Sequence, residues 1–243
     1  QITALTTAQM AALTTDQLVA METSDFAALT NSNIAAMLTA QVAAITTAEI
    51  VALTSAQAQS LTTAQAFALK TAQVVALATD DLASLNTASL AALQTAQIAA
   101  LATVQAQALT TAQATALTTK QVAAIVTADM AVLATDAVSV LSSAQIIALR
   151  TDQAFALTTK QAVALTSDQM LALETQDFAS LSTASVQALS TDIVSILSSA
   201  DIIALTTAQA QALATQQAFA LTSDQVAAME TRDVASLATS AVA

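Results

Sequence analysis

The chain has 243 residues, of which 56% are hydrophobic and 9% charged, and it contains no Gly, Pro, Cys, His, Trp or Tyr. Gly and Pro make tight turns and interrupt helices, so their absence favours helix over a fold built on β-hairpins. Seventeen acidic residues against five basic ones give a net charge of −12, which opposes binding to nucleic acid phosphates or to an anionic membrane surface.

An eight-residue repeat runs along the chain. Steps of eight from Leu5 to Leu237 give 30 positions, each of them Leu, Met or Ile, without insertion or deletion. We name this position a and the next seven b to h, so that each octad starts at b and ends at the next a, from residues 6–13 to residues 230–237. Position f is apolar and lies three residues before the next a, so the two share one helix face. All charged residues lie at b, d or e, which indicates a solvated outer face.

Position c is Thr or Ser in almost every octad, and these residues are preferred helix N-caps. The pattern predicts one short helix per octad, capped at c, with the chain bending at b and c. In the alternative, a single straight helix, the Leu row would drift by ~80° per octad, and no partner could cover it. The expected caps include Thr7, Thr15, Thr63, Thr111, Thr159 and Thr207.

Helices this short are not stable alone in water, so neighbouring turns of the chain must bury them. Octads with Ala at f carry a larger residue at g, and we expect that the buried face rotates there or that a neighbouring turn approaches closely. The Phe residues at g are expected to fill the core, with an exposed binding stripe as the alternative. The expected core includes Leu13, Leu61, Leu109, Leu157, Leu205, Phe67, Phe155 and Phe219.

Two features recur at a longer period. Octads with Asp at e, followed by an octad with a small residue at e, centre on Asp25, Asp81, Asp129, Asp177 and Asp233, at a mean spacing of 52 residues. Octads with Ala at f occur in adjacent pairs, spaced by about 6.3 octads. We therefore predict an all-α solenoid of 30 short capped helices, with roughly 6.4 repeats per superhelical turn. Duplication with occasional loss of an octad is the alternative.

The residue types needed for most catalytic and metal-binding sites are absent. Without His or Cys there is no catalytic triad, thiolate or imidazole ligand, and without Gly there is no phosphate-binding loop. The adjacent acids Asp80 and Asp81 lack the spacing of a calcium loop. We expect no enzyme activity, no cofactor and no metal. Polar clusters in each octad interrupt every apolar run of ~20 residues, so membrane insertion is not expected.

Two resemblances follow from the octads. Residues 71–78, TAQVVALA, resemble the opening of the DNA-binding repeat of TAL effectors, but over one octad only, and the acidic excess contradicts DNA binding. The LTTAQ-type octad resembles repeat tracts of large bacterial surface and adhesin-like proteins over nearly the whole chain. That resemblance implies an extracellular or cell-surface location.

Residues 1–243 are interpreted as one continuous octapeptide-repeat array. Neither end resembles a capping repeat, so we expect a segment of a longer array or subunits that stack. The leading hypothesis is a structural fibre, stalk, extracellular filament or spacer that self-associates end to end or side by side. The alternatives are a module that binds ice or another ordered surface through paired Thr residues, and a protein-binding solenoid scaffold.

Overall fold

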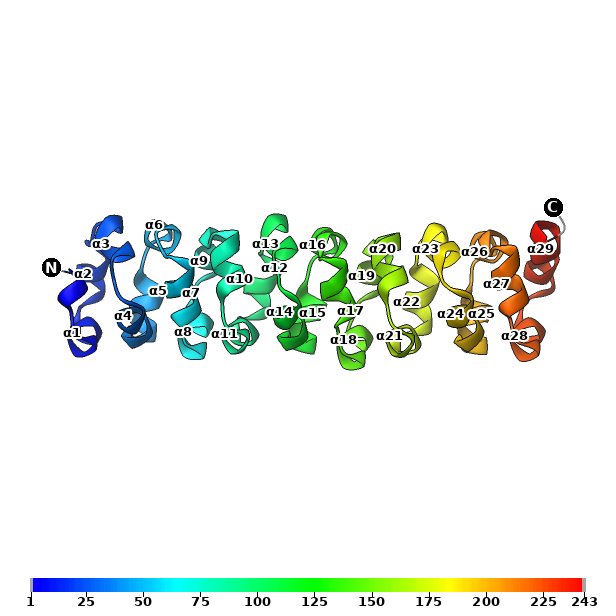
Figure 1. Ribbon diagram of the computed structural model, residues 1–243, viewed down its shortest axis with the longest axis horizontal. Helices are drawn as coiled ribbons and strands as arrows, with labels where there is room; N and C mark the ends of the chain where they lie inside the picture. The colour runs from blue at the N-terminus through cyan, green and yellow to red at the C-terminus, as the bar shows by residue number, and fades with distance from the viewer. Residues whose placement is uncertain (1, 242–243) are drawn as a thin grey trace. The chain divides into compact units, whose positions relative to one another are not determined.

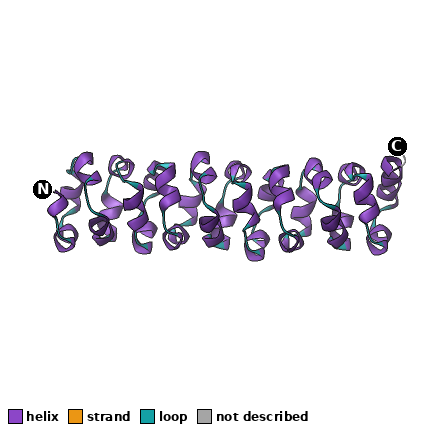
Figure 2. Cartoon of the chain, in the orientation of Figure 1, coloured by secondary structure: helices purple, strands orange, loops and turns teal. Residues whose placement is uncertain are grey.

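A computed structural model of the chain describes residues 2–241. Over these residues the regular structure is helical, without a strand, and comprises 29 α-helices. Figure 2 shows these helices joined by short loops. The predicted all-α repeat solenoid is thus confirmed. Residues 1 and 242–243 of the predicted array lie outside the described residues.

The chain divides into two compact units, Gln1–Ile125 and Val126–Ala243. The elements of the first unit are η1 (Ile2–Ala4), α1 (Thr7–Ala12), α2 (Thr15–Val19), α3 (Thr23–Ala27), α4 (Asn31–Ala36), α5 (Thr39–Ala44), α6 (Thr47–Val51), α7 (Ser55–Ser60), α8 (Thr63–Ala68), α9 (Thr71–Ala76), α10 (Thr79–Ser84), α11 (Thr87–Ala92), α12 (Thr95–Ala99), α13 (Thr103–Gln107), α14 (Thr111–Ala116) and α15 (Thr119–Ala124). Those of the second are α16 (Thr127–Val132), α17 (Thr135–Ser139), α18 (Ser143–Ile147), α19 (Thr151–Ala156), α20 (Thr159–Ala164), α21 (Ser167–Ala172), α22 (Thr175–Ser180), α23 (Thr183–Ala188), α24 (Thr191–Ile196), α25 (Ser199–Ala204), α26 (Thr207–Ala212), α27 (Thr215–Ala220), α28 (Ser223–Ala228) and α29 (Thr231–Ala241).

In most octads the helix ends because positions a and b take up extended backbone. Leu61 has φ −58° and ψ 129°, and Thr62 has φ −77° and ψ 161°. No residue of the described part has a positive φ, so the chain changes direction without the left-handed conformation that favours glycine. The absence of Gly is therefore compatible with a bend in every octad. The bend lies at a and b, one residue earlier than predicted. The predicted number of 30 helices is also wrong: the 30 positions a delimit 29 octads, each with one α-helix, and the last of these, α29, continues for 11 residues.

The helix caps likewise lie one residue earlier than predicted. In α14, the Gln113 N–H donates to Thr110 Oγ1 at 3.2 Å, and the Thr110 N–H donates to Gln113 Oε1 at 3.1 Å. This capping box requires a partner three residues after the cap, and position e lies three residues after b but only two after c. The predicted caps Thr7, Thr15, Thr63, Thr111, Thr159 and Thr207 are therefore wrong: they are first helical residues, and Thr6, Thr14, Thr62, Thr110, Thr158 and Thr206 are the caps.

One superhelical turn takes between three and four octads, so the predicted 6.4 repeats per turn is wrong. Within each unit a helix packs against the helix three places further along, as α5 does against α8 and α19 against α22. In Figure 1, α1, α4, α8 and α11 recur along one edge of the first unit. The 52-residue sequence period spans about two turns, because the side-chain contacts between successive turns join residues 26 to 28 apart. A side-chain pattern that recurs on every second turn doubles the apparent period.

Positions f and a fill the interior of each unit. Side chains at f are nearly all fully buried, as Leu82 and Met130 are, and those at a are 2–8% exposed in most octads. The core prediction is confirmed for Leu61, Leu109, Leu157 and Leu205, whereas Leu13, in the first turn, is half-buried.

The prediction that the Phe residues at g belong to the core is wrong. Phe67, Phe155 and Phe219 are 59%, 67% and 79% exposed. Position g is ~100° around the helix from f, and the buried face does not rotate to bring it inside. Ala58 and Ala66 at f remain fully buried, and the next turn packs against their helices, α7 and α8. The alternative of exposed aromatic side chains therefore holds.

The corrected caps can be tested with neighbouring threonines. We expect Thr110→Ala to lower the free energy of unfolding by about 1 kcal/mol, because the Gln113 N–H loses its acceptor. The matched change Thr111→Ala removes an exposed hydroxyl with no capping role and should stay within about 0.5 kcal/mol. Urea denaturation followed by circular dichroism measures both. A larger loss for Thr111→Ala would contradict the assignment.

Candidate functional site

The glutamine at position e links two turns of the solenoid. Gln105 is 2% exposed, and its Oε1 accepts from the Ala102 N–H at the start of its own helix, at 2.9 Å. Its Nε2 donates to the carbonyls of Leu77 and Val74, which end the helix one turn earlier, at 2.8 and 3.0 Å. Short helices leave N–H groups free at one end and carbonyls free at the other. A single primary amide therefore supplies partners for both ends.

The same contact recurs along both units, always with the carbonyl 28 residues earlier. Apart from the shorter bond of Gln97, the Nε2–O distances lie between 2.6 and 3.0 Å. Such donors in the first unit are Gln41, Gln57, Gln65, Gln73, Gln97, Gln105, Gln113 and Gln121, and in the second unit Gln161, Gln169, Gln209, Gln217 and Gln225. All of these side chains are buried.

Aspartate at e reverses the direction of the contact. A carboxylate only accepts hydrogen bonds, so it cannot donate to the carbonyls of the preceding turn. Asp81 instead accepts from Ser55 Oγ at 2.8 Å, and Asp177 from Thr151 Oγ1 at 2.7 Å. Each donor lies at position c, 26 residues earlier. Asp81 and Asp177 were predicted only as markers of a long period, and the structure gives them inter-turn partners.

In the octad after that of Asp81, position e is Ser89, and a second side chain helps to make the contact with the preceding turn. Ser89 Oγ donates to the Leu61 carbonyl at 2.7 Å, which is again 28 residues earlier. The N-cap of the same helix, Asn86, accepts from the Ser89 N–H at 2.8 Å and donates through Nδ2 to Leu61 and Gln59 carbonyls at 3.1 and 3.2 Å. The asparagine amide thus caps its own helix, as Thr110 does in α14, and also donates to the preceding turn as the missing glutamine would.

The two features that recur at the longer period are Ala at f and Asp at e. They lie on helices that pack against each other. Helices α7 and α8, with Ala at f, pack against α10 and α11, which carry Asp81 and Ser89. In the second unit α19, with Ala154 at f, packs against α22, which carries Asp177. The hydroxyl–carboxylate contact does not require Ala at f, however, because Thr175 in α22, with Phe178 at f, also donates to Asp201, at 2.9 Å.

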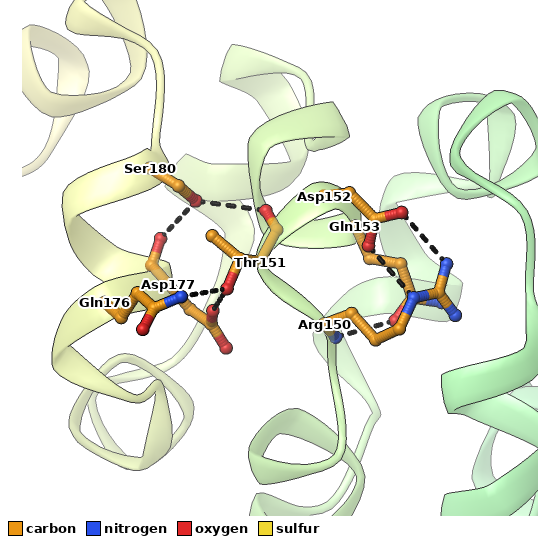
Figure 3. Close-up of polar contacts among 7 residues, drawn as sticks. All are labelled: Arg150, Thr151, Asp152, Gln153, Gln176, Asp177 and Ser180. Atoms are coloured by element: carbon orange, nitrogen blue, oxygen red, sulfur yellow. Dashed lines mark hydrogen bonds and ion pairs between the residues drawn. The ribbon is translucent and has the colours of Figure 1, made fainter.

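Figure 3 shows this contact between α19 and α22. The Thr151 hydroxyl lies between Asp177 and Gln176, whose Nε2 donates to it at 2.9 Å. Ser180 Oγ donates to the Asp177 carbonyl at 2.6 Å and reaches the Thr151 carbonyl at 3.3 Å. Side chain and backbone of one threonine are therefore both held by the next turn.

The same view contains an exposed ion pair between Arg150 and Asp152, with distances of 3.0 and 3.2 Å. The hydrogen bond from Arg150 lowers the pKa of the Asp152 carboxyl, and the positive charge of Arg150 adds to this effect. Both side chains are about half exposed, so the pair contributes little to stability. In the part of the chain that the structure describes, no three His, Cys, Asp or Glu side chains gather into a metal-binding group. Nor does any helix there have the length and apolar character to cross a membrane.

These features define a class of protein, a helical repeat solenoid whose turns are joined by side-chain amides. The ALTTAQ repeat family matches residues 18–55, 74–111, 122–159 and 170–207, which together make up more than half of the chain. The chain belongs to the ALTTAQ repeat family. Successive matches start 56, 48 and 48 residues apart, which is seven, six and six octads. No curated protein and no solved structure matches the chain.

The glutamine contacts were not predicted from the sequence. The available signal was the recurrence of Gln at e, next to the apolar position f. An amide placed beside the core in most octads indicates a buried hydrogen-bonding role.

The glutamine contact can be tested in the first unit with a matched pair. Gln105→Leu leaves the Ala102 N–H and the Leu77 carbonyl without their side-chain partner, and we expect the free energy of unfolding to fall by about 2–4 kcal/mol. Gln107→Leu changes an exposed glutamine of the same helix and should cost less than about 0.5 kcal/mol. Equal effects of the two changes in chemical denaturation would argue against the amide as the link between turns.

The hydroxyl–carboxylate contact can be tested in the second unit. Thr151→Val keeps the shape of the side chain but removes the donor to Asp177, and we expect a loss of about 1–3 kcal/mol. Thr159→Val, at the same position of the next octad, is the control and should cost less. Thermal and urea unfolding measure both. If Thr151→Val did not lower the free energy of unfolding more than Thr159→Val, the hydroxyl–carboxylate contact would not stabilise the packing of the turns.

Proposed function

We propose that the chain is a non-catalytic structural element, a stiff fibre, stalk or spacer, located outside the cell or on its surface. The observation that carries this proposal is the glutamine bond to the carbonyl 28 residues earlier, repeated with nearly constant length in both units. Each turn is completed by the turn before it, so adding octads extends a unit without changing its cross-section.

The proposed fibre grows end to end rather than side by side. Exposed acids at position d lie on the outside of the second unit, at Asp136, Asp168, Asp192 and Asp224. Two such surfaces laid together would repel each other, because the chain carries a net charge of −12. Contacts along the axis, in contrast, would use the uncharged amide–carbonyl bonds that already join successive turns.

A protein-binding scaffold is the second candidate, and the exposed phenylalanines favour it. Phe67, Phe155 and Phe219 are more than half exposed, and aromatic side chains of this kind are frequent anchors of protein interfaces. Binding of an ordered surface such as ice gains less support, because cap hydroxyls such as that of Thr110 already accept a bond from the helix.

The spacer function can be tested by doubling the array. Two copies joined by the linker Ala-Leu-Thr-Thr-Ala stay in the octad frame, because the linker supplies positions h to d between Ala243 and Gln1. We expect small-angle X-ray scattering to show about twice the length at an unchanged cross-section.

A second duplicate, with a linker one residue shorter, breaks the frame and serves as the control. It should scatter as two jointed particles. A thicker particle from the in-frame duplicate would mean that the copies pack side by side, and it would contradict the proposal. Electron microscopy of the unmodified chain tests self-association, with end-to-end filaments as the expected result.

A further inference from the structure

Four successive octads of the second unit lack glutamine at position e. They contain the helices α22 to α25, and their residues at e are Asp177, Ser185, Ile193 and Asp201. Elsewhere in the chain, such runs are at most two octads long. Because one superhelical turn takes between three and four octads, a whole turn of the second unit lacks the glutamine amide that joins most other octads to the preceding turn.

The aspartates at the two ends of this run still contact the preceding turn. Asp177 accepts from Thr151 Oγ1 at 2.7 Å, and Asp201 accepts from Thr175 Oγ1 at 2.9 Å. The helices between them, α23 and α24, differ. Among the residues that the structure describes, no hydrogen bond joins either of these helices to the preceding turn. Packing alone therefore holds α23 on α20 and α24 on α21.

Helix α11 of the first unit shows what α23 lacks. Both helices have serine at e, but Ser89 Oγ in α11 donates to the Leu61 carbonyl at 2.7 Å, and the cap Asn86 donates to the same carbonyl at 3.1 Å. In α23 the Oγ of Ser185 lies 2.8 Å from the Oγ of its own cap, Ser182. The serine pair is thus bonded to itself, and the link that α11 makes with α8 has no counterpart between α23 and α20.

Helix α24 departs further from the repeat, because Ile193 at e has no hydrogen-bonding group. Between Asn33 and Asp233 the side chains at e are all buried except that of Ile193, which is half-buried. Ile196, at position h of the same octad, is 38% exposed. Position e of α24 is therefore less enclosed by the preceding turn than any other e position in this range.

We propose that α23 and α24 form a yielding turn, the place where the second unit opens first and closes again. The apolar packing that holds them on α20 and α21 has no direction, whereas the neighbouring octads add directed hydrogen bonds. Regions with fewer such bonds and less complete burial open locally before the rest of a domain unfolds. The opening separates α23 and α24 from the turn before them.

The turn after them stays bonded, which confines the opening to one side. Gln217 Nε2 donates to the Leu189 carbonyl at 2.8 Å, and Gln225 Nε2 donates to the Leu197 carbonyl at 2.7 Å. The opening itself does not depend on the spacer function, since it concerns contacts within one unit. If the chain is the proposed spacer, and this clause rests on that function, the yielding turn lengthens the unit under tension before the other turns separate.

Backbone hydrogen exchange in the full chain, followed by NMR, tests the opening. The Val194 N–H donates to the Ser190 carbonyl at 3.0 Å, and the Ala162 N–H donates to the Thr158 carbonyl at 2.9 Å, so the two amides have equivalent bonds within α24 and α20. The octad of Ala162 has Gln161 at e. After correction for residue type, we expect Val194 to exchange at least about tenfold faster than Ala162. Equal protection of the two amides would overturn the proposal.

A restored glutamine gives the second test. Ile193→Gln supplies an amide that can accept from the Ser190 N–H and donate to the Leu165 carbonyl, 28 residues earlier. We expect it to slow the exchange of Val194 and to raise the Tm by about 2–4 °C. Ile203→Gln makes the same change at a side chain of α25 that is 52% exposed, and as the matched control it should alter neither quantity. Unchanged or faster exchange of Val194 in the Ile193→Gln chain would contradict the proposal.

Discussion

A helix of five or six residues leaves most of its backbone N–H and carbonyl groups without a partner inside the helix. The glutamine at position e resolves this for two helices at once, as Gln105 does for the start of α13 and the end of α9. Burial of f and a provides the hydrophobic stabilisation, but it has no direction. The amide adds direction, and it fixes which residue of one turn lies above which residue of the turn before.

Octads with aspartate in place of glutamine at e are also joined to the preceding turn by hydrogen bonds. A carboxylate at e needs a hydrogen-bond donor from the preceding turn. The hydroxyls of Ser55 and Thr151, at position c, provide it. Thr175 does the same for Asp201, although its helix has Phe178 at f. The contact therefore depends on a hydroxyl at c and not on Ala at f. Glu49 accepts from the N–H of its cap, Thr46, as glutamine does in the neighbouring octads.

The architecture was readable from the sequence because the octad is unbroken and its apolar positions share one helix face. The caps were placed one residue late, since Thr occurs at both b and c, and only the distance to Gln at e distinguishes Thr110 from Thr111. The turn length was overestimated because the Asp pattern recurs on every second turn. The exposure of Phe155 follows from its place at g, which leaves Val51 and Ile147 exposed as well, even where f is large. It was missed because the larger residues at g beside Ala at f were taken as a sign that the buried face rotates there.

Hydrogen exchange of the glutamine side-chain NH₂ groups, followed by nitrogen-15 NMR, tests whether buried amides at e join the turns. We expect strong protection for glutamines at e, such as Gln65 and Gln161, and fast exchange for exposed glutamines such as Gln107 and Gln211. Fast exchange at both kinds of position would show that the amides are not held between turns.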